Sequence, residues 1–179
     1  MYLRWLDEMT DTEPSHHLIT TPDQQPPLWA MAYRDIPEPG SLTGFTYGLS
    51  SAEHPDWKFG YPELMISLDS NDIEWVLAVG YLANAYRGIS PFSYGTIHRF
   101  GEQVSAESEM KAFVVFAPSL LAQADAHIEL PDRTINLVQM YPIYESEIEM
   151  IKFEGVGKFF DKVGDVHDPK RKPVVWESE

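Results

Sequence analysis

The 179-residue sequence contains no cysteine. Disulfide frameworks, zinc–thiolate sites, thiol nucleophiles and iron–sulfur clusters are therefore excluded. Basic residues are also scarce, because 13 Lys and Arg face 28 Asp and Glu, for a formal net charge of -15. Phosphate backbones are bound by Lys and Arg that displace counterions, so this charge argues against nucleic-acid binding and favours a basic protein partner. The simpler alternative is that the acidity only keeps the protein soluble.

Long apolar runs are missing as well, since no stretch approaches the roughly 20 apolar residues that a membrane-spanning helix needs. The start of the chain, Met1 to Glu8, has neither the apolar stretch nor the cleavage site of a secretory signal. We therefore expect a cytoplasmic protein with no membrane segment. The length fits one domain and does not indicate whether the chain pairs with itself.

Motifs for catalysis are also absent, including the Gly-x-Ser-x-Gly elbow, the phosphate-binding glycine loops and the HExxH zinc pattern. The histidines are scattered, and the one metal hypothesis brings His17, His54 and Asp56 together from two loops. A hydrolase would use His54 with Asp56 or Glu63. With 28 acids some carboxylates meet by chance, so we expect no enzyme activity, no metal and no cofactor.

Aromatic and branched residues, bounded by Pro and Gly, predict a series of strands. The strand candidates are residues 28–36, 42–49, 63–68, 96–100, 111–116, 127–130 and 135–141.

The clearest helix is predicted for residues 71–87, with Asn71 as its N-cap. The spacing of Ile73, Leu77 and Tyr81, with Val76, Gly80 and Asn84 alongside, predicts its buried stripe. Shorter helices are predicted for residues 144–154 and 156–163.

Strands outnumber helices without regular alternation, which predicts an α+β fold: a single domain with a mixed, mostly antiparallel sheet and helices packed on its faces. We assign residues 1–15 to an N-terminal segment that could be helical, residues 16–165 to the domain and residues 166–179 to a C-terminal tail. The basic stretch Pro169 to Pro173 could dock on the acidic body or bind an anionic partner, but a solvated terminus is the expected state.

Aromatic residues gather in one stretch of the sequence beside several acids. The aromatic residues are Phe45, Tyr47, Trp57, Phe59 and Tyr61, and the acids are Glu53, Asp56 and Glu63. At the edge of a sheet, such an acid-rimmed cluster would suit a basic partner. The alternative is core packing, and we expect the strand face shared by Phe45 and Tyr47 to be buried.

Several ordered segments resemble the suppressor of fused domain family, and its bacterial branch in particular, over residues 16–160. They are Thr43-Gly-Phe-Thr-Tyr-Gly-Leu-Ser50, Pro62-Glu-Leu-Met-Ile-Ser67, a helix with Trp75 and Leu82-Ala83, Gly95-Thr-Ile97, and Ile135-Asn-Leu-Val-Gln-Met-Tyr-Pro-Ile-Tyr144. This resemblance implies binding without chemistry.

The animal relative is a larger, non-enzymatic regulator that clamps a peptide of zinc-finger transcription factors between this domain and a second one. In that relative, an acidic residue that follows a Phe-x-x-Gly segment helps to hold the peptide. Phe92-Ser-Tyr-Gly95 resembles this segment, but Thr96 stands in the place of the acidic residue. This departure and the missing second domain argue against clamping of the animal kind. Bacterial relatives resemble immunity proteins of toxin systems.

The leading prediction is thus a cytoplasmic, non-enzymatic protein-binding domain, specifically an immunity protein that neutralises a basic toxin. One alternative is a peptide-binding adaptor that adds a partner strand to its sheet edge. Another is a metal-dependent hydrolase. The predicted partner-binding residues are Tyr47, Glu53, Asp56, Trp57, Tyr61, Glu63 and Thr96.

Overall fold

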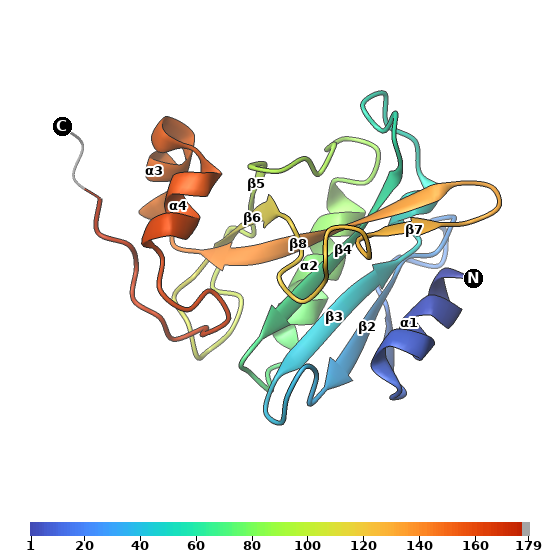
Figure 1. The fold of residues 1–179 in the computed structure, drawn as a ribbon, viewed down its shortest axis with the longest axis horizontal. Helices are drawn as coiled ribbons and strands as arrows, with labels where there is room; N and C mark the ends of the chain where they lie inside the picture. Colours follow the sequence, from blue (N-terminus) through green and yellow to red (C-terminus); the bar gives the residue numbers. More distant parts are fainter. Residues whose placement is uncertain (177–179) are drawn as a thin grey trace.

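The computed structural model describes residues 1–176. Over these residues the chain forms an eight-stranded sheet with four α-helices and one short 3-10 turn, η1 (Figure 1). The elements in chain order are α1 (Tyr2–Thr10), β1 (Ser15–Leu18), β2 (Trp29–Arg34), β3 (Leu42–Tyr47), η1 (Leu49–Ser51), β4 (Tyr61–Leu68), α2 (Glu74–Ala85), β5 (Ile97–Arg99), β6 (Ala112–Phe116), β7 (His127–Glu129), β8 (Thr134–Ile143), α3 (Glu147–Glu154) and α4 (Val156–Lys162). Every predicted strand forms, with ends that shift by a residue or two, whereas the sequence did not predict β1.

The strands follow the order β1-β2-β3-β4-β8-β6-β5, and β7 pairs with β8 outside this path. Among the strands described, β4 and β8 run parallel and the other pairs are antiparallel. The predicted α+β class with a mixed, mostly antiparallel sheet is therefore confirmed. None of the helices within residues 1–176 has the length and apolar content needed to cross a membrane.

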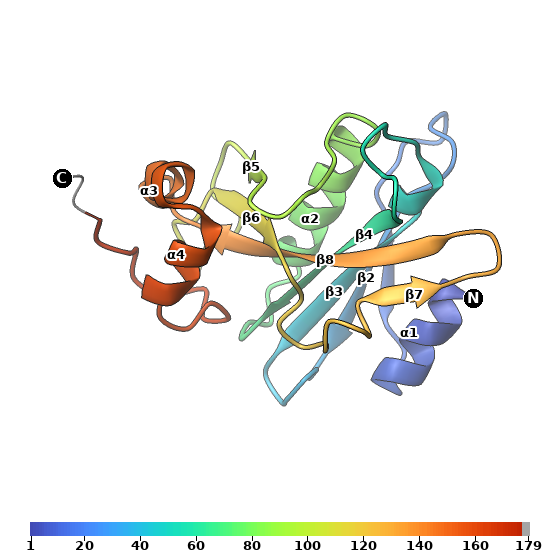
Figure 2. The same ribbon diagram turned by 45° about the horizontal axis from the view of Figure 1, so that its top comes forward.

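Helix α2 covers one face of the sheet, and Figure 2 shows it on the side opposite to α1. Two glycines permit this close packing. A Cβ on Gly44 of β3 would lie 2.6 Å from the side chain of Val76, and one on Gly80 would lie 2.9 Å from Ile19. The helix thus approaches the sheet so closely that its small and branched residues form the contact.

The predicted cap of this helix is wrong, and its predicted buried stripe is correct only in part. Tyr81 is 51% exposed, whereas Trp75 and Val79 are buried. The helix begins at Glu74, whose N–H is accepted by the carboxylate of Asp72 at 3.1 Å, so Asn71 is not the cap. Ile73 and Leu77 are partly buried against the core, and the glycine contacts turn the adjoining face, which carries Val76 and Gly80, onto the sheet.

Helix α1 covers the opposite face, where Tyr2 and Leu6 pack against Met31 of β2 and Phe45 of β3. The N-terminal segment therefore contains a helix, which the sequence had left open. Strand β1 follows α1 and pairs with β2 at the border of the sheet.

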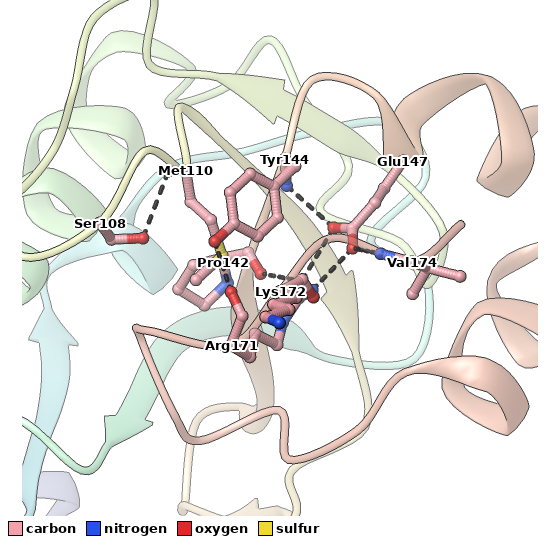
Figure 3. A network of polar contacts seen from close by, with 8 residues as sticks. All are labelled: Ser108, Met110, Pro142, Tyr144, Glu147, Arg171, Lys172 and Val174. Atoms are coloured by element: carbon pink, nitrogen blue, oxygen red, sulfur yellow. Dashed lines mark hydrogen bonds and ion pairs between the residues drawn. The ribbon is translucent and has the colours of Figure 1, made fainter. Parts of the chain in front are cut away.

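Helices α3 and α4 and residues 166–176 cover the end of β6 and β8 that lies far from α1 (Figure 1). Here β8 continues through Pro142, beyond the predicted end of the strand. Residues 166–176 do not form the solvated terminus that was expected. The reason is Arg171, a buried residue whose guanidinium pairs with the carboxylate of Glu147 at 2.6 Å and donates to the carbonyl of Pro142, as Figure 3 shows.

Candidate functional site

Two loops lie side by side where the chain leaves η1 and α2. Residues 52–60 connect η1 to β4, and residues 86–96 connect α2 to β5. The indole N–H of Trp57 donates to the carbonyl of Pro91 at 3.0 Å, and a ring nitrogen of His54 lies 3.2 Å from the carbonyl of Ile89. We call the exposed sides of these two loops the loop surface.

Large aromatic side chains project from this loop surface. Phe59 is 91% exposed and Tyr94 is 52% exposed. Both side chains line a groove of about 350 Å³, with Trp57, His127 and Asn136 also in its wall. Exposed aromatic side chains beside a groove are typical of protein-interaction surfaces.

Acidic residues stand at the rim of the loop surface, where Glu53 and Asp56 are exposed. The backbone N–H of Asp56 donates to Nδ1 of His54 at 3.1 Å, so Nδ1 is an acceptor. This leaves the proton on Nε2, which then donates to Ile89. His54 therefore connects the two loops, and the exposed carboxylate of Asp56, 3.9 Å from Nδ1 of His54, is accessible to a partner.

Glu63 lies beneath the loop surface and is fully buried, so the surface position expected for it is wrong. Its carboxylate accepts hydrogen bonds from the Thr46 hydroxyl (2.6 Å), the Gly48 N–H (3.0 Å), and the N–H and hydroxyl of Ser50 (3.0 and 2.7 Å). Burial raises the pKa of Glu63, and these hydrogen bonds oppose the shift. The carboxylate thus fixes η1, from which the first loop departs.

His98 plays the corresponding part for the second loop. Its buried ring packs on Phe92, with 4.9 Å between the ring centroids, and its Nε2 lies 3.3 Å from the Ser90 hydroxyl. That hydroxyl accepts the N–H of Phe92. Burial lowers the pKa of His98 to about 4, so the ring is neutral near pH 7.

The structure brings most of the predicted loop residues together. The rings of Trp57 and Tyr61 lie 6.1 Å apart, and the Arg133 guanidinium lies 5.3 Å over the ring of Tyr61. Thr96 is half-buried at the base of the second loop, where its carbonyl accepts the N–H of Val115.

Tyr47 and Phe45 have different environments, although they share a strand face. Phe45 is buried as expected, but Tyr47 is 39% exposed and stacks on Tyr2, with ring centroids 6.3 Å apart. The expected burial of Tyr47 is therefore wrong, because α1 covers this end of the sheet only in part.

The metal hypothesis is also wrong. Within residues 1–176, no group of three His, Asp or Glu side chains is arranged to hold a metal ion. His17 is thus not brought to His54 and Asp56, and its ring instead contacts the Ser15 hydroxyl at 3.0 Å on β1.

Sequence reasoning missed Tyr94 and His98. The signal for Tyr94 was an aromatic residue among the turn-forming residues 88–95, where a large side chain has little core to enter. The burial of His98 had no comparable signal, because it depends on Phe92 and Ser90 folding back over the strand.

The fold is thus a single α+β domain whose exposed aromatic residues include a pair on two neighbouring loops. The sequence matches the profile of the suppressor of fused protein (SUFU) family over residues 24–172, so the chain belongs to this family. Among curated proteins, none matches the sequence.

Solved structures share this fold. A suppressor of fused homolog from Neisseria gonorrhoeae FA 1090 is similar with a TM-score of 0.75 and 16% identity, over 98% of this chain and 96% of that one. Drosophila Suppressor of Fused has a TM-score of 0.70 and 14% identity, over 97% of this chain and 50% of its own. A chain of the Sufu-Fu complex has a TM-score of 0.67 and 16% identity, over 97% and 90%.

Proposed function

We propose that this protein is a non-enzymatic binding domain that holds a protein partner on the loop surface. The observation that carries the proposal is the pair of exposed aromatic side chains, Phe59 and Tyr94, in the wall of the groove. Both loops are held by buried residues, Glu63 and His98. Because the loops are already ordered, binding a partner would not cost the conformational entropy of ordering them. The similar fold found in the Sufu-Fu complex supports a protein as the partner.

We further propose that the partner is basic, and that the protein acts in the cytoplasm as an immunity protein against a basic toxin. The formal net charge of -15 and the exposed rim of Glu53 and Asp56 support this sign. Trp57 and Tyr61 would stabilise the conformation of the surface, while the side chains of Phe59 and Tyr94 would insert into the surface of the partner.

The chain offers well-matched variants for testing the loop surface. Tyr94 and Tyr81 are 52% and 51% exposed, and Tyr81 lies on α2, outside the loops. The tagged wild type, Tyr94→Ala, Phe59→Ala and the control Tyr81→Ala are used for affinity capture from a lysate of the source cells, with quantitative mass spectrometry. We expect the two loop variants to weaken a stoichiometric partner by more than about 1 kcal/mol each and the control to retain it.

Capture at low and high salt tests the charge. A basic partner should be lost at high salt, because the screening length falls below about 8 Å. A partner that Tyr94→Ala and Phe59→Ala retain as well as Tyr81→Ala does would overturn the assignment of the loop surface. A partner that is not basic would overturn the toxin proposal alone.

The adaptor alternative is favoured by a separate observation. Strands β1 and β5 end the described sheet, so each has one edge without a neighbouring strand. A short linear peptide would be enough for an adaptor, whereas a toxin inhibitor needs a folded partner.

A further inference from the structure

The free edge of β1 has a defined set of unpaired backbone groups. The N–H of Ile19 donates to the carbonyl of Leu28 at 2.9 Å, which makes these two residues a hydrogen-bonded pair. Hydrogen-bonded residues alternate along an antiparallel ladder, so His17 also faces β2. The N–H and C=O groups of His16 and Leu18 therefore point away from the sheet.

No charged side chain within β1 protects this edge. Three of the four residues of β1 are exposed, among them His16 and Leu18, and the strand contains no Lys, Pro or bulge. Natural sheets guard exposed edges with such features or by keeping the edge strand short, and of these β1 has only its length of four residues. The border at β1 is therefore open to an added strand.

A cavity of about 650 Å³ adjoins this edge on the side of α1. Its wall contains His16 together with Asp7, Asp11 and Glu13, from α1 and the turn that follows it. Within residues 1–176, none of these three carboxylates takes part in an ion pair. Tyr33 also lies in the cavity wall, and burial together with the charge of Asp7 raises the pKa of Tyr33 to about 12.

The orientation of β1 determines how its free edge lies relative to the acidic cavity. His16 lines the cavity, so side chains on this face of β1 point to the α1 side. In a strand paired with β1, the residue next to His16 on the same face would direct its side chain to the three carboxylates. Backbone pairing would position such a segment, and a positive charge would select it.

We propose that the free edge of β1 binds an extended, basic segment of a partner protein, with backbone pairing to His16 and Leu18 and a Lys or Arg side chain among Asp7, Asp11 and Glu13. This surface is distinct from the loop surface and deepens the adaptor alternative by naming its edge and its ligand class.

The first test uses labelled seven-residue peptides and fluorescence anisotropy at physiological ionic strength. The probe alternates Lys and Val, and the matched peptide alternates Glu and Val. We expect the Lys peptide to bind at least about tenfold more tightly than the Glu peptide. Equal binding of the two peptides, or no binding of the Lys peptide at millimolar concentration, would overturn the proposal.

Charge variants locate the site without disturbing the fold. Asp7→Asn with Glu13→Gln should weaken the Lys peptide by about tenfold. The control Glu53→Gln with Asp56→Asn removes the same charge from the loop surface and should leave binding unchanged. If the control weakens the peptide as much as the α1 variant does, the attraction is general and the β1 site is wrong.

Backbone pairing has its own test. Leu18→Pro removes only an outward N–H, so the sheet should form while peptide binding falls. Hydrogen exchange followed by NMR should show the amides of His16 and Leu18 in the wild type becoming protected when the peptide binds. Unchanged exchange would overturn strand addition, as would a dimer in sedimentation that Leu18→Pro abolishes, because the occupant would then be a second copy. Phe59→Ala should bind the peptide normally, which separates this result from that of the loop surface.

Discussion

Two buried carboxylates hold the two ends of this molecule in different ways. Glu63 beneath the loop surface accepts its hydrogen bonds from neutral donors on residues that precede it by 13 to 17 positions. Glu147 of α3 forms an ion pair with Arg171, 24 residues further along, at 2.6 and 2.8 Å. The first carboxylate therefore acts as a hydrogen-bond acceptor that shapes the turn at η1, while the second acts as a charge that binds the C-terminal segment.

This difference has an electrostatic consequence. Burial raises the pKa of Glu63 and lowers the pKa of His98 to about 4, so both shifts favour the neutral forms beneath the loop surface. At the other end, Arg171 compensates the charge of Glu147 and lies over the rings of Tyr144 and Phe159. The loop end should therefore depend on hydrogen-bond acceptors and on pH, and the tail end on the presence of both charges.

The largest expected effect comes from Arg171→Met. This change leaves the Glu147 carboxylate buried without its cation, which typically costs about 3–5 kcal/mol of unfolding free energy. Urea denaturation measures the loss. The control is Arg99→Met, which breaks the exposed pair with Glu145 and should cost less than about 1 kcal/mol. Equal losses of unfolding free energy for the two variants would show that the buried ion pair stabilises the fold no more than the exposed pair does, which would contradict the proposed difference between the two ends.

Glu63→Met should have the next largest effect. It removes the acceptor for Thr46, Gly48 and Ser50 and leaves their buried donors without a partner. We therefore expect the free energy of unfolding to fall by about 3 kcal/mol. Glu63→Gln keeps one acceptor oxygen and should cost less than about 1 kcal/mol, because a raised pKa means that the charge itself is not stabilising. Urea denaturation of both variants tests this, and a large loss for Gln would show that the charge holds the turn.

The smallest of the three effects is the acid sensitivity of His98. Because its folded pKa of about 4 lies below the unfolded value near 6.5, the unfolded chain binds the proton more readily, and stability falls as the pH drops from 6.5. From pH 8 to pH 5 the loss attributable to His98 is about 2 kcal/mol. Glu63 acts in the opposite direction, so the comparison is between the wild type and His98→Gln.

Thermal or urea unfolding at a series of pH values should therefore give a flatter profile for His98→Gln than for the wild type. Parallel profiles would mean that the ring accepts its proton without disturbing the fold, and that the second loop is not held by a neutral anchor.

Local patterns in the sequence predicted the strands well. Residues 28–36 and 42–49 combine aromatic and branched side chains between turn-forming residues, and they become β2 and β3. Trp57 and Tyr61 were placed in one cluster because they are neighbours in sequence, and their rings do meet. The prediction worked where the decisive contacts join residues close together in the chain.

The predictions failed where a distant contact decided the outcome. The spacing in the helix predicts that Tyr81 is buried, but Gly44 and Gly80 draw the adjoining face onto the sheet. The sequence places Glu63 in the acidic rim of the aromatic cluster, and only the four donors around its carboxylate explain why it is buried.

The sequence by itself determined the α+β class, the strongly acidic charge and the aromatic stretch around Trp57, because composition and local periodicity set these properties, and the resemblance of its ordered segments indicated the family. Only the tertiary structure decided which carboxylates are buried, that Arg171 returns to Glu147, and that His16 and Leu18 border an acidic cavity. The physical reason is that burial and ion pairing depend on groups that are brought together from distant parts of the chain when the sheet forms.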